Sequence, residues 1–232
     1  MKIVCLTSNA YHNVLVPFAH YWNRFGFRQV TVACYDAPLP DLPDNFEVLR
    51  IGNQADYTWS SGLKRALTLV DDAHVMLLLE DYFLTAPADW FVIGLAAGAL
   101  QNNRNIAKFD LSDDRMKYGH HPDGSALGVI LSDWDAPFQT SLQAAIWRTD
   151  FLYRWLDDSE NAWQFEKDGT RRIINARRRG ICTDIIAGFR EPPLRYANAV
   201  GGAGGKPGVI ERKHMPEWMF DECVAKGWAD NG

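Results

Sequence analysis

The chain has 232 residues, a length typical of one domain or of one domain with a small appendage. Hydrophobic residues make up 47% of it, and no apolar run approaches the roughly 18 to 20 residues of a membrane-spanning helix. The formal net charge of −5 argues against a protein that simply coats nucleic acid. We therefore expect a soluble globular protein with no transmembrane segment.

The N-terminus and the cysteines predict a cytoplasmic location. Residues 1–10 contain one lysine and a very short apolar segment, which predicts a first β-strand and no signal peptide. Cys5, Cys34, Cys182 and Cys223 lie far apart and form no CxxC pair, which argues against a zinc site. Cysteines of this kind suit a reducing compartment.

Strands and helices are predicted to alternate through roughly the first 110 residues. Short apolar runs predict strands at 2–8, 29–36, 46–52, 74–82 and 105–112. Helical spacing of apolar residues predicts helices at 14–26, 60–73 and 87–103. Ser60 or Ser61 is the expected N-cap of the second helix. This alternation is typical of a parallel α/β sheet flanked by helices.

The second half of the chain is less regular. It contains two expected strands, an expected helix, a basic stretch and a glycine-rich loop, at 128–133, 140–148, 149–156, 170–180 and 190–208. Thr149 is the expected N-cap of the helix. No internal repeat is visible, and no linker is long enough to divide the chain, so a single domain is expected.

Two adjacent carboxylates follow the strand at 74–82, which is apolar on both faces and therefore expected to be central. In an open α/β sheet, ligands bind beyond the carboxyl ends of the strands, where Glu80 and Asp81 fall. Two close carboxylates repel each other unless a cation lies near them, and Mg²⁺ or Mn²⁺ bridging to substrate phosphates is a common solution. The alternative is a solvated turn in which Asp81 caps a short helix.

Polar residues at other strand ends are candidates for the same ligand. Thr7, Ser8 and Asn9 end the first strand and Asp36 ends the second, where a nucleotide base or ribose commonly rests. Lys64, on the helix before the acidic strand, is a candidate for a phosphate contact. Ordinary turn residues and a solvated helix face are the alternatives.

Three segments resemble a group of bacterial and phage glycosyltransferases with the GT-A fold. They are HVMLLLEDYFL at 74–84, FQTSLQAAIWRTDFLYRWLDDSENAWQFE at 138–166 and LRYANAVGGAGGKPGVI at 194–210. In this group the strand-end Glu-Asp-Tyr-Phe stands where better-known GT-A enzymes carry Asp-x-Asp. The resemblance covers most of residues 1–228, and the middle segment is its most specific part.

The resemblance implies a GT-A-like, Rossmann-like single domain that transfers one sugar from a nucleotide-sugar donor with the help of a divalent cation. Residues 1–110 would form the nucleotide-binding half and residues 111–232 the acceptor-binding half. Tyr82 follows Asp81 in place of the second aspartate of Asp-x-Asp, so Asp81 and Glu80 are the metal ligands that remain. Arginine and lysine residues are an alternative means of neutralising the diphosphate.

Glu166 is the candidate catalytic base. In an inverting transferase a carboxylate removes the proton from the attacking hydroxyl. Trp163 and Phe165 precede Glu166 and are expected to give the acceptor an apolar wall that raises the pKa of the carboxyl. The alternative places both aromatic rings in the core and Glu166 in solvent. Asp150, Asp157 and Asp158 are rival acids.

Further candidates lie on both sides of this segment. Gln143 is a candidate for hydrogen bonds to sugar hydroxyls, and Lys206, in a glycine-rich loop, for closing over the diphosphate. His214 is a weaker candidate metal ligand. Arg171 and Arg172, in the basic stretch, are expected to meet phosphates of the donor, of a lipid-linked acceptor or of DNA. A solvated helix face and a surface loop are the alternatives for these charges.

The expected function is therefore transfer of a sugar to an acceptor hydroxyl, which belongs either to a surface glycan or to a hydroxylated DNA base of a phage. Reaching such a base within a duplex requires flipping it out of the stack. Nucleotidyl transfer is the rival enzyme class, and a non-catalytic nucleotide- or glycan-binding domain is the rival outside enzymology.

Overall fold

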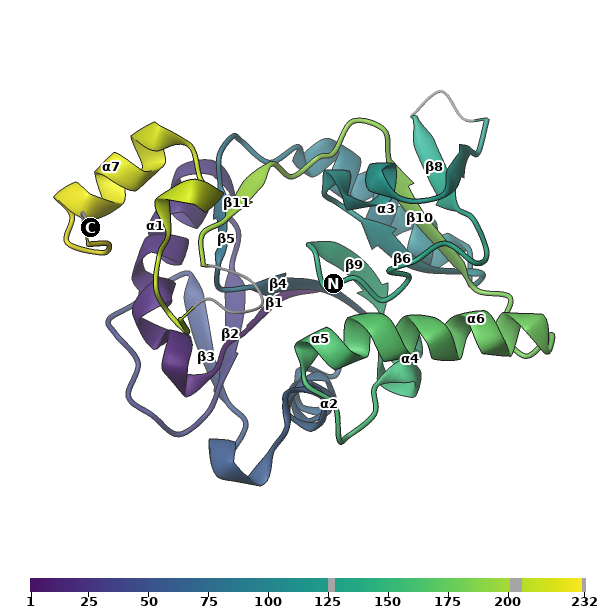
Figure 1. Cartoon of the computed structure of the whole chain (residues 1–232), viewed down its shortest axis with the longest axis horizontal. Helices are drawn as coiled ribbons and strands as arrows, with labels where there is room; N and C mark the ends of the chain where they lie inside the picture. The colour runs from purple at the N-terminus through teal and green to yellow at the C-terminus, as the bar shows by residue number, and fades with distance from the viewer. Residues whose placement is uncertain (125–127, 201–205, 231–232) are drawn as a thin grey trace.

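The computed structural model describes residues 1–124, 128–200 and 206–230, and its central element is a nine-stranded sheet in the order β3-β2-β1-β4-β9-β6-β10-β8-β7 (Figure 1). The strands are β1 Lys2–Leu6, β2 Val30–Cys34, β3 Phe46–Arg50, β4 His74–Leu79, β6 Ile106–Asp110, β7 His120–Pro122, β8 Val129–Ser132, β9 Ala145–Arg148 and β10 Ile185–Phe189. Strands β8 and β9 run antiparallel to their neighbours, and the others share one direction. The predicted mostly parallel α/β sheet is confirmed.

Helices cover both faces of this sheet. They are α1 Leu15–Phe25, α2 Trp59–Val70, α3 Trp90–Asn102, α4 Thr149–Trp155, α5 Ala162–Gln164, α6 Thr170–Arg178 and α7 Glu217–Ala225. Alternate residues of a strand face opposite sides of a sheet. In β1, Ile3 and Cys5 belong to the core cluster that includes α1 and α3, while Val4 and Leu6 belong to the cluster that includes α2, α4 and α6. Figure 1 shows α2, α4 and α6 together on one side of the sheet.

Two predicted helix caps are wrong by one to three residues. The N-cap of α2 is Thr58, whose hydroxyl accepts a hydrogen bond from the Ser61 backbone while the Ser61 hydroxyl accepts from the Thr58 backbone. This reciprocal pair is a capping box, so Ser61 serves the third helical position. Thr149 begins α4 and follows the cap residue Arg148, because its own hydroxyl donates to the Asp72 carbonyl at 2.6 Å.

A second, two-stranded sheet lies immediately after the acidic pair. Strand β5, Tyr82–Leu84, pairs antiparallel with β11, Tyr196–Asn198, and the Ala199 N–H donates to the Asp81 carbonyl at 2.8 Å. The sequence predicted neither strand, because each has three residues and its partner lies more than a hundred residues away. The small sheet fixes the backbone on both sides of the site described below.

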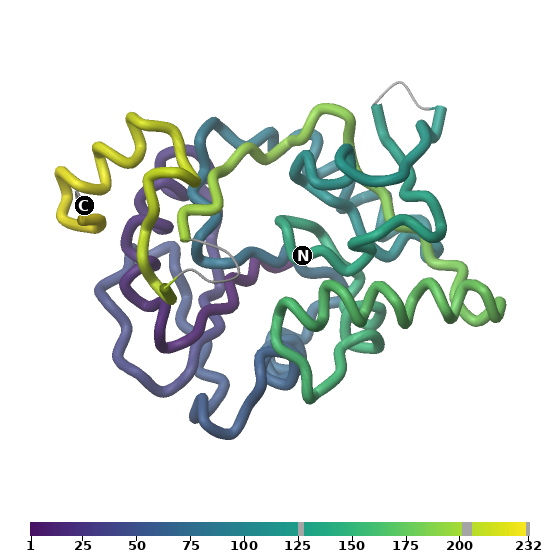
Figure 2. Tube along the Cα trace, viewed as in Figure 1, coloured from purple at the N-terminus to yellow at the C-terminus, as the bar shows by residue number. Residues whose placement is uncertain are grey.

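The C-terminal segment returns to the N-terminal helix. Figure 2 shows the last part of the chain running beside α1. The Asn13 side chain donates to the Gly208 carbonyl at 2.8 Å, and the Tyr21 hydroxyl donates to the Met219 carbonyl at 3.1 Å. Across the described residues, no helix combines the length and the apolar character needed to cross a membrane.

Candidate active site

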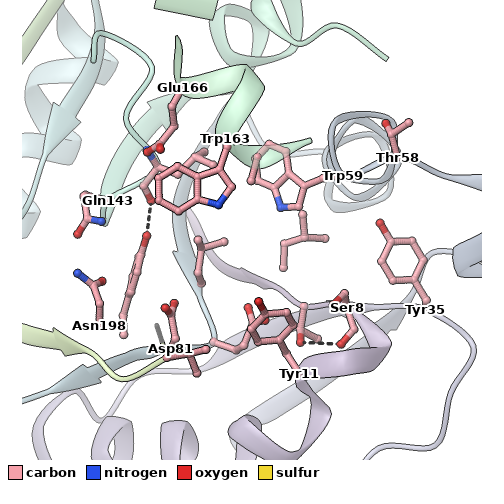
Figure 3. Close-up of a pocket in the computed structure, with 18 of the residues that line it drawn as sticks. Ser8, Tyr11, Tyr35, Thr58, Trp59, Asp81, Gln143, Trp163, Glu166 and Asn198 are labelled. Carbon is pink, nitrogen blue, oxygen red and sulfur yellow. Dashed lines mark hydrogen bonds between the residues drawn. The ribbon is translucent and has the colours of Figure 1, made fainter. Parts of the chain in front are cut away.

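A cavity of about 480 Å³ opens beyond the carboxyl ends of β1 and β4 (Figure 3). This is the edge of an α/β sheet at which ligands generally bind. Its described lining residues are Leu6, Thr7, Ser8, Tyr11, Tyr35, Gln54, Tyr57, Thr58, Trp59, Leu79, Glu80, Asp81, Tyr82, Leu142, Gln143, Ala162, Trp163, Glu166, Asn198, Val200 and His214. The cavity therefore collects residues from both halves of the chain.

The acidic pair lies in the wall of this cavity. Glu80 is buried and Asp81 is partly exposed. Burial raises the pKa of Glu80 well above its ordinary range, and the neighbouring Asp81 carboxylate raises it further. Burial also raises the pKa of Asp81 to about 7. A bound cation would favour the ionised form of both groups, so the pair is suited to cation binding.

Glu166 reaches the same cavity from the segment between α5 and α6. Its Oε1 accepts a hydrogen bond from the Leu142 backbone N–H at 2.7 Å, which fixes one oxygen of the carboxyl. Burial raises the pKa of this group despite that hydrogen bond. The two aromatic residues before Glu166 lie in different places. Trp163 is half exposed and lines the cavity, whereas Phe165 is buried in the core beneath α2. Of these two residues, Trp163 therefore contributes to the expected apolar wall and Phe165 does not.

Aromatic side chains form most of the end of the cavity that lies away from Asp81, which we call the aromatic end. Figure 3 shows Trp59 and Trp163 on one wall, Tyr11 and Ser8 on the opposite wall, and Tyr35 beyond them. Flat aromatic faces of this kind stack on nucleobases and sugar rings. Sequence reasoning missed Trp59 and the tyrosines, because they come from turns and helix starts on different segments.

A hydrogen-bonded group of polar residues supports this aromatic end. The Asn9 backbone N–H donates to the Gln54 side chain at 2.7 Å, and the Asn9 amide donates to Asp36 at 3.2 Å. Asp36 also accepts from the Gln54 backbone N–H at 3.0 Å, and these bonds lower the pKa of its carboxyl. Gln54 lines the cavity, whereas Asn9 and Asp36 do not line it and instead form hydrogen bonds with Gln54. The structure thus brings Asn9 and Asp36 together, one step away from the cavity wall.

Of the remaining polar residues predicted to contact the donor, some line the cavity and one does not. Thr7, Ser8 and Gln143 line the cavity. Lys64 points elsewhere: its ammonium group lies 2.6 Å from Asp158, outside the described lining. A phosphate role for Lys64 would require breaking that ion pair.

The two candidate arginines of the basic stretch also have partners of their own. Arg172 makes a two-pronged ion pair with Glu160 at 2.6 and 2.7 Å, and Arg171 pairs with Asp168. Neither lines the cavity. The sequence pattern does not predict these ion pairs, which form because α6 places each arginine beside an acid from a neighbouring turn.

The C-terminal candidates lie at and beyond the rim. Lys206 is exposed and is not among the described lining residues, and the glycines at 201–205 lie outside the described part of the chain. His214 does line the cavity, where its Nε2 lies 3.2 Å from a carboxylate oxygen of Glu211. Considering only residues 1–124, 128–200 and 206–230, no group of three or more His, Cys, Asp or Glu side chains could hold a metal ion.

Known structures share this fold. No family model matches the chain, and no curated protein matches it in sequence. The crystal structure of residues 1–349 of S. aureus TarS superposes with a TM-score of 0.50 at 12% identity over 84% of this chain. The fold is GT-A-like. The chain spans 59% of that TarS fragment, and TarS has also been crystallised in complex with UDP.

Two further structures are similar to a lesser degree. UDP-glucose pyrophosphorylase complexed with UDP-glucose has a TM-score of 0.48 at 11% identity, covering 85% of this chain and 93% of its own. CMP:2-keto-3-deoxy-manno-octonic acid synthetase complexed with CTP has a TM-score of 0.46 at 14% identity, covering 98% and 96%. The comparison with TarS shows the fold alone, and membership of the bacterial and phage group stays a prediction.

Proposed function

We propose that the chain is a glycosyltransferase that moves a sugar from a nucleotide-sugar donor to an acceptor hydroxyl. The observation that carries this proposal is the convergence of Glu80, Asp81 and Glu166 on one cavity at the ligand-binding edge of a GT-A-like sheet. Carboxylates from two distant segments supply both groups that the reaction needs: one near the leaving diphosphate and one near the acceptor hydroxyl.

The donor would lie along the length of the cavity. The nucleobase of the donor would stack among Trp59, Tyr11 and Tyr35 at the aromatic end of the cavity. Gln54 would present polar groups to the edge of the nucleobase. The diphosphate would then lie at the acidic end, beside Asp81.

A divalent cation suits that acidic end. The described lining contains three carboxylates and neither lysine nor arginine, so a bare diphosphate would be repelled. We propose that Mg²⁺ or Mn²⁺ is held by Asp81 and Glu80 together with phosphate oxygens of the donor, an arrangement common for Mg²⁺. When bound, the cation stabilises the negative charge of the leaving diphosphate.

In the proposed reaction, the acceptor hydroxyl oxygen forms a bond to the anomeric carbon as that carbon's bond to the diphosphate oxygen breaks. The electron pair of the breaking bond leaves with the diphosphate, and the hydroxyl proton passes to the carboxylate of Glu166. The raised pKa of Glu166 makes it a stronger proton acceptor than an exposed glutamate. Its hydrogen bond from Leu142 holds one oxygen and leaves the other for the acceptor.

A nucleotide panel tests the donor half of this proposal. UDP, GDP, CMP and dTDP would be added in thermal-shift assays with and without Mn²⁺, with UDP first because it is the nucleotide in the TarS complex. We expect one nucleotide to raise the melting temperature with Mn²⁺, and its sugar conjugate to be slowly hydrolysed. Pyrophosphate release from a nucleoside triphosphate would instead indicate nucleotidyl transfer. Binding without hydrolysis would indicate a non-catalytic binding domain.

Two substitutions separate the roles of the carboxylates in the same assay. Asp81→Asn should reduce donor hydrolysis at least about 100-fold and weaken the nucleotide shift, because the cation loses a ligand. Glu166→Gln should reduce hydrolysis about 100-fold while leaving the nucleotide shift unchanged, because it removes only the base. Glu47→Gln, exposed on the edge strand β3, is the control. Near-normal hydrolysis in Asp81→Asn would exclude Asp81 from the diphosphate site.

A further inference from the structure

A second cavity adjoins the first. It has a volume of about 410 Å³ and is lined by Thr85, Ser112, Asp113, Lys117, Gln143, Pro192, Leu194, Arg195, Tyr196 and Asn198. Gln143 and Asn198 line both cavities, so these two carboxamides stand at the junction. The second cavity lies beyond the carboxyl end of β6, which runs in the same direction as β1 and β4. Both cavities therefore open at the same edge of the sheet.

Hydrogen bonds hold the junction in place and orient its donor groups. The Tyr196 hydroxyl accepts from the Ala144 backbone N–H at 2.9 Å and donates to Oε1 of Gln143 at 2.7 Å. This pair of bonds turns the carboxamide oxygen of Gln143 toward Tyr196 and leaves its NH₂ group without a partner among the described residues. Tyr196 is held in turn by stacking on Tyr82 with ring centroids 4.5 Å apart. The amide groups of Gln and Asn suit recognition of sugar hydroxyls.

The charges of the two cavities differ in sign. The first has carboxylates and neither lysine nor arginine in its described lining, whereas the second has Lys117 and Arg195 against the single acid Asp113. Lys117 lies 2.9 Å from Asp113, and Arg195 lies 3.6 Å from Glu191, in pairs whose side chains are more than half exposed. Exposed ion pairs of this kind contribute little, so either cation is able to turn toward a bound anion.

We propose that this second cavity is the acceptor subsite and that it takes a saccharide carrying a carboxylate or a phosphate. This inference rests on the proposed glycosyl transfer. The saccharide hydroxyl would enter between Gln143 and Asn198 toward the donor, while Lys117 and Arg195 hold the anionic group. A saccharide is favoured over DNA because the carboxamides of Gln143 and Asn198 at the junction suit sugar hydroxyls, whereas Arg171 and Arg172, the basic residues first considered for a DNA backbone, do not line this cavity.

The test is a binding series that needs no donor. Glucose, glucuronic acid and glucose 6-phosphate differ only at carbon 6, and their affinities would be measured by saturation-transfer NMR titration. We expect one or both anionic probes to bind about tenfold more tightly than glucose, because a charge-assisted hydrogen bond adds at least that factor. The comparison of glucuronic acid with glucose 6-phosphate shows which anion the site prefers.

Variants then locate the binding. Arg195→Ala and Lys117→Ala should each weaken the preferred anionic probe about tenfold and leave glucose unchanged. Arg154→Ala, on the exposed side of α4, is the matched control and should change neither. Asp81→Asn should also leave probe binding unchanged, because it lines only the first cavity.

The outcomes separate this inference from the proposed function. Equal affinity of the anionic probes for wild type and both variants, or no measurable binding of any probe, would overturn the subsite. Binding of an oligonucleotide with hydroxymethylated bases, reduced by Arg195→Ala in the absence of saccharide binding, would overturn the saccharide in favour of nucleic acid. If no nucleotide raised the melting temperature in the thermal-shift panel, the proposed glycosyl transfer would be rejected. The saccharide titration would still test whether the second cavity binds an anionic saccharide, because it needs no donor.

Discussion

At the scale of single residues, the site keeps carboxyl groups where folding alone would not place them. Glu80 is buried, and the pKa values of both Glu80 and Asp81 are raised by loss of contact with water. A buried carboxylate without a bound cation lowers the stability of the folded chain. Residues retained at such a cost are commonly functional, which agrees with a role in cation and diphosphate binding.

The stability of the chain should therefore depend on pH through Asp81. Its pKa rises from 3.8 in an unperturbed state to about 7 in the folded chain, so the folded chain binds more protons between these values. Stability then falls as the pH rises through this window, and the loss is complete above pH 7. Asp81→Asn should raise the free energy of unfolding by about 2 kcal/mol at pH 8, allowing for partial exposure of the carboxyl, and by almost nothing at pH 4.

Urea unfolding of wild type and Asp81→Asn without divalent cations, at pH 4 and pH 8, measures this difference. Asp44→Asn, in an exposed turn, is the control and should leave the pH profile unchanged. A variant that is less stable than wild type at pH 8 would show that the Asp81 carboxylate is stabilised in the fold, contrary to the burial argument.

At the scale of elements, glycines set how closely α2 approaches the site. A methyl group at Gly62 of α2 would overlap the hydroxyl of Tyr35, which lines the aromatic end of the cavity. Gly94, in the middle of α3, has open space around the same position. Glycine in a helix costs roughly 0.5–1 kcal/mol relative to alanine, so the two sites are a matched pair with opposite expected outcomes.

Gly62→Ala should lower the free energy of unfolding by about 1–3 kcal/mol, because the helix or Tyr35 must move. It should also weaken the nucleotide shift, because Tyr35 leaves its place in the base-binding end. Gly94→Ala should raise the free energy of unfolding by about 0.5–1 kcal/mol and leave nucleotide binding unchanged. Denaturant titrations and the thermal-shift panel measure both effects; equal stability of the two variants would disprove close packing at Gly62.

At the scale of the whole molecule, the sequence predicts the layers better than their connections. Short apolar runs predicted the strands of the first half. The tendency of ligands to bind beyond the carboxyl ends of parallel strands predicted that Glu80 and Asp81 would lie at the binding site. Strand order was not predictable, because β9 enters the sheet between β4 and β6 through pairings such as Val75 with Trp147. The aromatic end of the cavity was missed for the same reason: Trp59 reaches it through tertiary packing, which local sequence patterns do not encode.

This strand order argues that the predicted halves 1–110 and 111–232 fold as one cooperative unit. Strand β9 belongs to the second half, yet it pairs with β4 and β6 of the first half along both of its edges. Without β9, strands β4 and β6 would expose unpaired backbone groups in the middle of the sheet.

We therefore expect thermal unfolding of the whole chain to show one transition, with coincident near-ultraviolet and far-ultraviolet circular dichroism curves. A tightly binding nucleotide should move both curves together, since its cavity is lined from both halves. A fragment of residues 1–110 should show no cooperative melting, because β9 is missing from it. A fragment that melts cooperatively and binds the same nucleotide would show instead that the first half is an independent nucleotide-binding domain to which β9 contributes only packing.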